Sequence, residues 1–456
     1  MIVLDPALGP EGGHHVALLE RVHSALESGE CSSPVEFYSS RKIRKSLERF
    51  ATDQIRITPF FDTNFYRYSA TLPNIAEANG FIAALGKEYL AALKRVFTES
   101  VLIDEADPTA PQRAHRNGKL IIFYPAMQWV HLMAVQFALR LIGSAVSGHQ
   151  VEHRVCLMYN PGRNHTGEVM NVAEWLSYKM ACKSIAAYAS VKLYASDYEL
   201  AEHFGRLLEL DSPLPLHPQY LAEMGDLAAP PAVQKSGKKI GIYFGDAKSD
   251  KGFNRLPELL EQVIPTIGAD DQVVIQYTSQ GNCPRVLAAE EKIRKFAQGE
   301  PRLSVISRYL PAEEIQAILF SLDVFVFTYD VHHYQNKSSG FLWLLADKSC
   351  QLIFLGESWL SREATRLRLN VCVCAFNQLS EVLQGLFVEG RLAYSEGSKN
   401  SSSAYGGVES EYRERLFAPF FQWLCSDPRK KLQVGQALGD PMSFFSNTEF
   451  SWSDKC

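Results

Sequence analysis

The stretch that decides the fold runs from Lys239 to Phe253 and reads Lys-Ile-Gly-Ile-Tyr-Phe-Gly-Asp-Ala-Lys-Ser-Asp-Lys-Gly-Phe. An apolar strand is followed here by a glycine, two lysines and the start of an expected helix. Amide hydrogens at a helix start carry part of the helix's positive end, and Lys248 and Lys251 add full positive charges. The pattern therefore predicts a loop that holds an anion such as phosphate. The competing interpretation is an ordinary surface loop with exposed lysines.

A second loop of the same kind covers residues 334–340 and reads Tyr-Gln-Asn-Lys-Ser-Ser-Gly. It falls between an expected strand at 324–328 and an expected helix that begins near Gly340. A lysine beside a serine helix cap would explain each loop singly. It would not explain why both loops lie at the ends of two nonadjacent strands. Two such loops in one parallel sheet predict a diphosphate ligand.

From Lys239 onward, strand-like and helix-like segments alternate regularly. The strands are continuous apolar runs, such as Val273-Val274-Ile275, as expected where both faces of a parallel sheet are buried. The expected strands are 240–244, 272–277, 303–306, 324–328, 351–354 and 371–375, and the expected helices are 256–264, 285–296, 312–319, 341–346, 360–367 and 379–386. This order predicts a doubly wound, Rossmann-like domain.

The N-terminal half shows a less regular version of the same pattern. Its expected strands are 2–4, 120–124, 155–159 and 190–194, and its expected helices are 15–26, 74–97 and 131–142. We therefore expect an α/β protein with two Rossmann-like doubly wound domains that face each other across a cleft. Ligands of such sheets bind at the carboxyl ends of the strands.

We place the domain boundaries by composition. The expected divisions are an N-terminal domain at 1–225, a linker rich in proline and alanine at 226–238, a C-terminal domain at 239–410, and a helical segment at 411–456 that packs back toward the N-terminal domain. The aromatic run within that segment, Phe417–Trp423, is interpreted as core or interlobe packing, with a peripheral membrane contact as the open alternative.

Bulk properties narrow the class of protein. A chain of 456 residues is long enough for two apolar cores, and a net charge of −5 does not favour a nucleic-acid partner. The N-terminus has no basic segment followed by a cleavage site, and no apolar run reaches the ~18 residues of a membrane span, so a cytoplasmic location is expected. The nine cysteines lack paired spacing, which predicts reduced thiols and no zinc site.

The C-terminal half resembles the nucleotide-sugar-binding domain of bacterial glycosyltransferases with the two-domain GT-B fold, in the broad group around family 4, also called glycosyltransferase group 1. The matching segments, in order, are Gly245–Phe253, Arg308–Pro311, Tyr329–Gly340 and Gly356–Ala364. The resemblance covers about residues 239–386. The first half matches only in its layout and in a glycine-rich first turn, 9–15. The family usually carries two glutamates separated by seven residues, whereas Lys337 and Leu345 stand at those places.

The resemblance implies a role for each matching residue. It implies that the donor diphosphate contacts Lys248, Lys251, Gly252, Ser338, Ser339 and Gly340. Tyr334 is a further expected donor-binding residue of the same loop, and Lys337 is the right residue type to contact the diphosphate. Thr278, Tyr309 and Leu310 would border the base and ribose. Glu357 and Ser358 would lie near the donor sugar, and we count Glu357 among the catalytic candidates.

In the N-terminal half, Gly12 and Gly13 could approach a substrate, and His14 or His15 could deprotonate an acceptor hydroxyl. A helix start with two partly exposed histidines is the alternative. Gln128, Asn160 and Arg163 are candidate acceptor contacts, with a polar turn as the alternative account of the last two. His332 and His333 are adjacent in sequence, which does not give convergent metal ligands, so no metal site is predicted.

The resulting expectation is a glycosyltransferase that needs no metal and no resident cofactor. It would move a sugar from a nucleoside diphosphate sugar to a hydroxyl of a glycan, a lipid-linked saccharide or a protein. Two alternatives remain. One is a nucleotide-sugar epimerase of the same fold, and the other is a degenerate transferase that binds a nucleotide or a protein partner without turnover.

Overall fold

The computed structural model describes residues 1–9, 13–29, 33–68, 75–106, 120–143, 151–219, 237–279, 283–346, 348–388, 412, 414–416, 418 and 420–425. Gly12, most of the expected linker and residues 389–411 lie outside these ranges. Cys156, Cys182, Cys283, Cys350, Cys372 and Cys374 form no disulfide. No helix among the described residues is long and apolar enough to cross a membrane.

The N-terminal half contains a six-stranded sheet in the order β3-β2-β1-β4-β5-β6, with every pair parallel. Its strands are β1 (Ile2–Asp5), β2 (Val35–Ser40), β3 (Ile55–Phe61), β4 (Leu120–Met127), β5 (Val151–Leu157) and β6 (Val191–Ala195). Its helices are α1 (Gly13–Glu27), α2 (Ile75–Ala106), α3 (Trp129–Ile142), α4 (Val172–Ala186) and α5 (Tyr198–Leu207), with short 3-10 turns η1 (Lys45–Phe50) and η2 (Phe65–Tyr68).

The C-terminal half contains a second six-stranded parallel sheet, in the order β12-β11-β10-β7-β8-β9. Its strands are β7 (Lys239–Asp246), β8 (Gln272–Thr278), β9 (Leu303–Ile306), β10 (Val324–Phe327), β11 (Gln351–Phe354) and β12 (Val371–Val373). Its helices are α6 (Leu256–Val263), α7 (Pro284–Gly299), α8 (Ala312–Ser321), α9 (Gly340–Leu344), α10 (Trp359–Arg366) and α11 (Leu379–Val388), with 3-10 turns η5 (Ser249–Lys251), η6 (Phe253–Arg255), η7 (Ile264–Thr266) and η8 (Phe376–Gln378).

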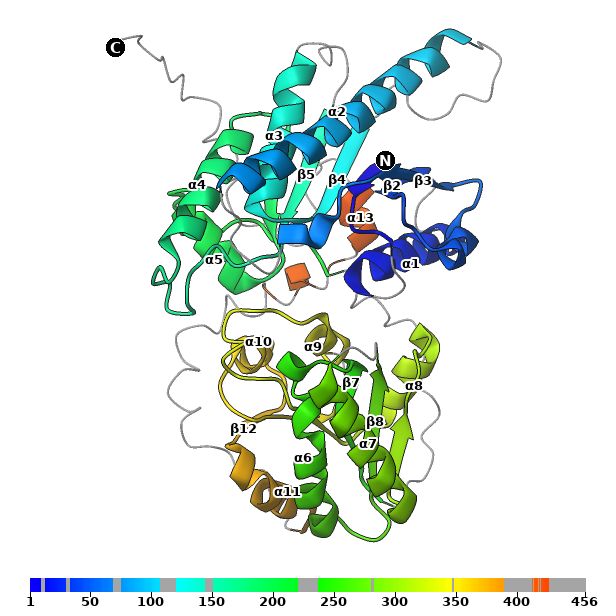
Figure 1. Ribbon diagram of the computed structural model, residues 1–456, viewed down its shortest axis with the longest axis vertical. Coiled ribbons are helices and arrows are strands. Elements are labelled where there is room, and N and C mark those ends of the chain that lie inside the picture. Colours follow the sequence, from blue (N-terminus) through cyan, green and yellow to red (C-terminus); the bar gives the residue numbers. More distant parts are fainter. Residues whose placement is uncertain are drawn as a thin grey trace. The chain divides into compact units, whose positions relative to one another are not determined.

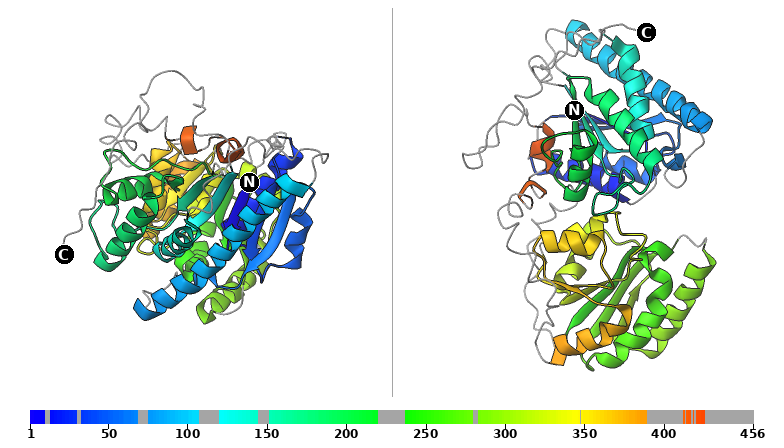
Figure 2. Two further views of the ribbon diagram at one scale, coloured as in Figure 1. Left: turned by 90° about the horizontal axis from the view of Figure 1, so that it is seen from above. Right: turned by 90° about the vertical axis from the view of Figure 1, so that its left-hand side faces the viewer.

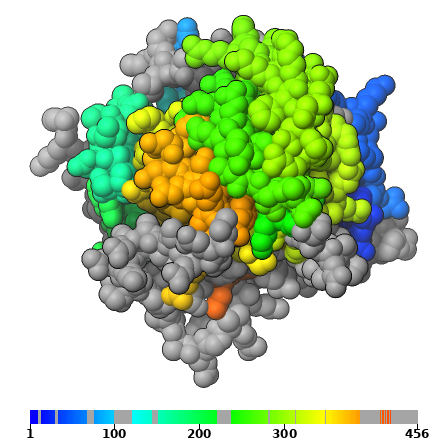
Figure 3. All heavy atoms as spheres, turned by 90° about the horizontal axis from the view of Figure 1, so that it is seen from below, coloured from blue at the N-terminus to red at the C-terminus, as the bar shows by residue number. Residues whose placement is uncertain are grey.

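Helices cover both faces of each sheet (Figures 1 and 2). In the second half, α6, α7 and α11 share one apolar core with the strands, and α8, α9 and α10 share the other. Helix α6 buries Leu256, Leu259, Leu260 and Val263, which is the spacing of one helix face. The surfaces of α6 and α11 adjoin in the space-filling view of Figure 3. Between these helices, Ser380 Oγ donates to Gln262 O at 3.2 Å.

A short C-terminal helix, α13 (Phe420–Cys425), packs on the first sheet (Figure 1). Phe420, Phe421 and Leu424 are buried in one cluster with residues of β1, β2 and β4. The aromatic rings of this helix therefore belong to a protein core, in agreement with the interpretation as core packing. Phe417 lies outside the described residues.

The prediction of two Rossmann-like doubly wound domains is confirmed, and every strand expected after Lys239 is present. In the N-terminal half the prediction was incomplete, because β2 and β3 were not expected and β5 begins at Val151 rather than Val155. The start of β5 contains Glu152, His153 and Arg154, which read as a polar segment but are buried. Strand β3 contains Pro59, which an edge strand tolerates.

Candidate functional site

The two predicted anion loops meet at the carboxyl ends of β7 and β10. The two strands are not consecutive in sequence, but they pair directly in the sheet. The expectation that the two loops follow nonadjacent strands was therefore wrong for the folded sheet. Gly252 has φ of 80° and packs so closely that an added Cβ would lie 1.9 Å from Thr328 O. Thr328 Oγ1 donates to Lys251 O at 2.8 Å, and Asp330 N donates to Asp250 O at 3.0 Å. The turn after β7 is therefore held directly against the end of β10.

The helix expected immediately after Lys251 begins later. Two 3-10 turns precede it, and α6 starts only at Leu256. The amides of Lys251 and Phe253 donate to Lys248 O, at 3.1 and 3.2 Å. These amides are therefore bonded within the turn, and the first turn of α6 does not supply the loop with anion-binding donors. The left-handed conformation of Gly252 causes the delay, because it interrupts helical geometry.

Three lysines lie at this junction. Lys248 Nζ lies 3.1 Å from Asp246 Oδ2, and Lys337 Nζ lies 3.1 Å from Asp250 Oδ2. Lys251 is partly buried, and no ion pair to it is formed by the described residues. Burial lowers the pKa of Lys251, and the nearby Lys248 charge lowers it further. A cation that has already lost part of its water gains more from an arriving anion.

The second loop reaches the same place through Tyr329. The Lys251 ammonium lies 5.9 Å from the centre of the Tyr329 ring, and the Tyr329 hydroxyl lies 3.3 Å from Ser339 Oγ. Lys251 and Ser339 therefore flank one buried tyrosine, and Lys337 reaches the first loop through Asp250. The Ser339 hydroxyl does not cap α9; Ser338 and Gly340 are partly exposed beside it.

Two carboxylates share this junction with the lysines. Burial alone would raise the pKa of Asp250, but the hydrogen bond from Lys337 and its charge leave that pKa below the ordinary value. The pKa of Asp246 is likewise lowered by Lys248, against the effect of burial. Both groups are therefore anionic at neutral pH.

Gln276 connects the end of β7 to Arg308, next to the residues expected around the base. Its Oε1 accepts from Gly245 N at 2.9 Å, and its Nε2 donates to Arg308 O at 2.7 Å. Thr278 Oγ1 donates to Asp246 Oδ1 at 3.0 Å. Tyr309 is exposed and Leu310 is buried. Sequence reasoning gave Gln276 no role of its own, although a polar residue inside an apolar strand was the available signal.

The loop expected near the donor sugar adjoins the second anion loop. Trp359 N donates to Tyr334 O at 3.0 Å, and Gln335 Nε2 donates to the carbonyl of Glu357 at 2.7 Å. The side chain of Glu357 is exposed, whereas Ser358 is buried at the start of α10, where its amide donates to Ser361 Oγ at 3.0 Å. Tyr334 itself is buried.

In the first half, a chain of three polar side chains lies after β1. His15 Nδ1 lies 2.8 Å from Asp5 Oδ2, and His15 Nε2 lies 2.7 Å from the Tyr66 hydroxyl. Asp5 Oδ1 also accepts from Ala7 N at 3.1 Å. His15 is buried, so the alternative of two partly exposed histidines describes only its neighbour His14. Asp5 and Tyr66 were missed, although an aspartate that ends a buried strand was a signal for Asp5.

Other polar groups gather at the same edge of the sheet. Burial, and next the electrostatic effect of the neighbouring His15 ring, lower the pKa of His14, which follows the exposed Gly13 at the start of α1. Gln128 is buried after β4, and its backbone N–H donates to His131 Nδ1 at 3.2 Å. Burial lowers the pKa of His131 to about 3, although a hydrogen bond to Phe65 O raises it. The imidazole rings of His14 and His131 are therefore both neutral at physiological pH.

Asn160 and Arg163 make their contacts within their own loop. Asn160 Oδ1 accepts from Arg163 N at 2.7 Å. The Arg163 guanidinium lies 3.8 Å from the centre of the Trp175 ring and donates to Gly167 O. These contacts are those of a polar turn, and an acceptor contact by either residue stays a prediction.

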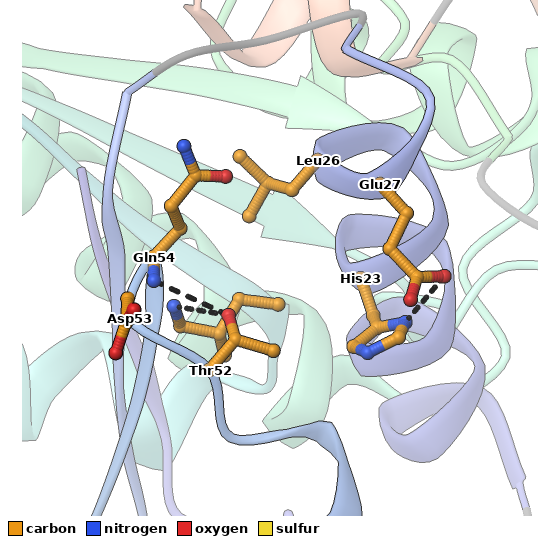
Figure 4. Close-up of a pocket in the computed structure, with 7 residues that line it drawn as sticks. His23, Leu26, Glu27, Thr52, Asp53 and Gln54 are labelled. Atoms are coloured by element: carbon orange, nitrogen blue, oxygen red, sulfur yellow. Dashed lines mark hydrogen bonds and ion pairs between the residues drawn. The ribbon is translucent and has the colours of Figure 1, made fainter.

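A hollow of about 380 Å³ lies elsewhere on the first half (Figure 4). It is lined by His23, Leu26, Glu27, Thr52, Asp53, Gln54 and Ile55. These residues lie at the carboxyl end of α1 and before the first residue of β3. The hollow is therefore at the amino edge of the sheet, opposite the edge that carries Asp5 and His15.

No protein-family model and no curated protein matches the sequence. Among solved structures, the chain is similar to the N-terminal domain of Candida albicans trehalose-6-phosphate phosphatase, with 14% identity, 93% and 96% of the two chains covered, and a TM-score of 0.51. It is also similar to a Burkholderia vietnamiensis α,α-trehalose-phosphate synthase (UDP-forming) and to an E. coli trehalose-6-phosphate protein bound with UDP-2-fluoro glucose. Each of these two is 10% identical, with 93% and 97% coverage and a TM-score of 0.50. The likeness establishes a GT-B fold over nearly the whole chain.

Proposed function

We propose that this protein transfers a sugar from a nucleoside diphosphate sugar to a hydroxyl acceptor without a metal ion. The observation that carries the proposal is the meeting of Lys251, Lys337 and Ser339 around Tyr329 and Asp250 at the carboxyl edge of the second sheet. Two loops that are far apart in sequence supply cations and a hydroxyl to one place, as a diphosphate requires. Two of the solved structures of this fold carry UDP in their descriptions, which supports the choice of ligand.

The chemical demand on the site is to stabilise a leaving diphosphate. As the bond between the anomeric carbon and the phosphate oxygen breaks, negative charge grows on that oxygen. Fixed cations in a partly dehydrated place stabilise this charge. Lys251 is suited to the role because it is partly buried and its ammonium is not paired with a carboxylate among the described residues. On binding, the Lys337 ammonium group would contact a phosphate oxygen in place of the Asp250 carboxylate.

The remaining assignments belong to the same proposal. Gly252 allows the turn to approach β10, Thr278 and Tyr309 border the base, and Glu357 and Ser358 adjoin the donor sugar. Leu345, which stands at the place of a family 4 glutamate, is buried in the apolar core. Lys337 at the other place supplies a cation. Catalysis in this chain therefore rests on charge stabilisation of the diphosphate and on a base from the first half.

Binding of UDP, ADP and GDP, measured by thermal shift and calorimetry, tests the donor site. Lys251→Met removes the cation and keeps the length of the side chain, so the dissociation constant is expected to rise ~10-fold or more, the value of a charge-assisted hydrogen bond. Ser339→Ala is expected to weaken binding less. Lys295→Met is the matched control, because Lys295 is an exposed lysine paired with Glu291 on α7.

Release of nucleoside diphosphate from a panel of nucleotide sugars tests turnover. Release that depends on an added hydroxyl acceptor supports transfer. Conversion of the donor sugar without release would identify an epimerase, and binding without either reaction would identify a nucleotide-binding module. Failure of all three nucleotides to bind would contradict the proposal.

A further inference from the structure

Asp5, His15 and Tyr66 form a connected chain of polar groups from the interior to the surface. The Asp5 side chain is 1% exposed and the His15 side chain 7%, whereas Tyr66 is 39% exposed. The three residues come from β1, α1 and η2, so the fold brings them together from three separate elements. They lie at the carboxyl edge of the first sheet, where ligands of such sheets bind.

We infer that these three groups form a relay that removes the proton from the acceptor hydroxyl, with Tyr66 as the group that touches the acceptor. The inference rests on the proposed function, because it supplies the base for that transfer. Tyr66 is then a catalytic residue, His15 is the final proton acceptor, and Asp5 is a positioning residue. The sequence already suggested His15 as a base, and the structure adds its two partners, Asp5 and Tyr66.

The hydrogen bonds fix the tautomer of His15. The Asp5 carboxylate has only acceptors to offer, and it accepts from Ala7 N as well as from the imidazole. His15 Nδ1 must therefore carry the ring proton. Nε2 is left with a lone pair, and this nitrogen accepts from the Tyr66 hydroxyl at 2.7 Å. A phenolic oxygen that donates its proton can also accept a hydrogen bond, and Tyr66 would accept from the substrate hydroxyl in this way.

The proposed step balances without any further reactant. The acceptor oxygen forms a bond to the anomeric carbon while the bond from that carbon to the diphosphate oxygen breaks. The acceptor proton passes to the Tyr66 oxygen, and the Tyr66 proton passes to His15 Nε2. The diphosphate leaves with the bonding electrons, and His15 becomes an imidazolium paired with Asp5. Solvent takes the proton from His15 before the next cycle.

The groups that face the relay favour this assignment. They are His14, beside His15 on α1, Tyr89 on α2, His131 on α3 and Tyr159 after β5. None of them carries a charge at neutral pH, because burial lowers the pKa of both histidines and raises that of both tyrosines. Asp5 is therefore the one charge among these groups that stabilises a protonated His15.

Nitrogen-15 NMR of the histidine rings tests the relay without any substrate. The spectrum of the full chain at pH 7 is expected to show His15 with its proton on Nδ1, and Asp5→Asn is expected to alter the His15 ring shifts. A His15 ring that carries its proton on Nε2, or on both nitrogens, would overturn the inference. His15→Gln assigns the signal.

Steady-state kinetics with the donor that releases diphosphate tests the step itself. Tyr66→Phe keeps the ring and removes the hydroxyl, so kcat is expected to fall by ~10²-fold or more while KM for the donor changes little. Asp5→Asn is expected to lower kcat similarly. Tyr188→Phe, a partly buried tyrosine in the turn after α4, is the control for loss of a hydroxyl.

The outcomes separate the two proposals. Wild-type turnover by Tyr66→Phe would overturn the relay and leave the glycosyltransferase proposal intact. Loss of turnover with unchanged thermal shift by the nucleotide supports the relay. If the wild-type protein binds no nucleotide, the proposed function fails, and with it the transfer step.

Discussion

Gly252 shows how a single residue can join two loops. Its φ is 80°, a conformation that favours glycine, and its Cα faces a backbone carbonyl rather than a movable side chain. Any other residue would bring a Cβ within 1.9 Å of Thr328 O, which no real contact allows. Glycine is therefore required here for two reasons: the positive φ and the lack of room for a Cβ beside Thr328 O.

Gly252→Ala is therefore expected to push the turn away from β10. The free energy of unfolding should fall by about 1–3 kcal/mol, the cost of a strained backbone position, and nucleotide binding should weaken because Lys251 moves with the turn. Denaturant unfolding and thermal shift measure the two effects. Gly299→Ala is the control, since an added Cβ at the end of α7 meets nothing within 4 Å. Equal effects of the two substitutions would contradict the packing argument.

Asp197 provides a prediction on pH. This residue is buried at the start of α5, where its Oδ1 accepts from Leu200 N at 3.0 Å. Burial, and next the charge of Glu363, raise its pKa from 3.8 to about 7. The folded protein therefore binds this proton more tightly than the unfolded chain does. Stability from Asp197 is complete below about pH 4 and is lost as the pH rises toward 7.

Asp197→Asn should remove that pH dependence, because the amide stays neutral and can still cap the helix. The free energy of unfolding of the wild type should fall between pH 4 and pH 8 by at most about 4 kcal/mol more than that of the variant. Urea unfolding at several pH values checks this, with the exposed Asp53→Asn as control. Parallel pH curves for wild type and Asp197→Asn would refute it.

At the residue scale, sequence reasoning found groups that belong to one local segment. Lys248, Lys251, Lys337 and Ser339 could be singled out because each follows a recognisable strand, and the structure places them together. The partners of those residues could not be found in the same way. Tyr66 meets His15 only because η2 folds over the end of β1, a contact between residues 51 positions apart.

At the scale of elements, α13 contributes to the core of the first half despite its position near residue 420. Phe420 is fully buried, and its ring lies 6.0 Å from that of Phe123 on β4. Phe420→Ala is expected to lower the free energy of unfolding by about 3–5 kcal/mol, the cost of a large core truncation. Denaturant unfolding measures this. Leu287→Ala, at a site 44% exposed on α7, should change stability far less.

The elements themselves were predictable wherever burial and polarity agree. Strand β10 is four apolar residues, all buried, and the sequence predicts it within one residue. Strand β5 is also entirely buried, but it contains a Glu152–Arg154 ion pair at 2.6 Å and a His153 ring bonded to Tyr124. When buried polar side chains form hydrogen bonds with one another, a strand lacks the hydrophobic pattern by which it could be predicted.

At the scale of the whole molecule, an ion pair joins the two halves of the chain. Arg362 on α10 donates to both carboxylate oxygens of Glu199 on α5, at 2.9 and 3.1 Å, and both side chains are largely buried. Arg362 also donates to Gln335 O at 2.6 Å, within the second anion loop. The pair therefore links the first half to the loop at 334–340, which belongs to the proposed donor site.

A double-mutant cycle of Glu199→Ala and Arg362→Ala should give a coupling energy of about 1–3 kcal/mol, because the two side chains are largely buried and share two hydrogen bonds. Without Arg362, Glu199 keeps, among the described residues, only its longer contact with Arg366 Nη2, at 3.6 Å. The exposed pair Glu291–Lys295 on α7 is the control and should give less than about 0.5 kcal/mol. Chemical unfolding of the four variants of each cycle supplies the numbers. Additive losses at Glu199 and Arg362 would show that the pair contributes no net interaction.

The contact between Gly252 and Thr328 also limits how this domain can be re-engineered. The two loops share backbone hydrogen bonds, so neither has an independent shape that could be moved alone. A graft onto another scaffold would have to carry residues 246–255 and 328–340 as one cassette, together with the spacing of β7 and β10 beneath them.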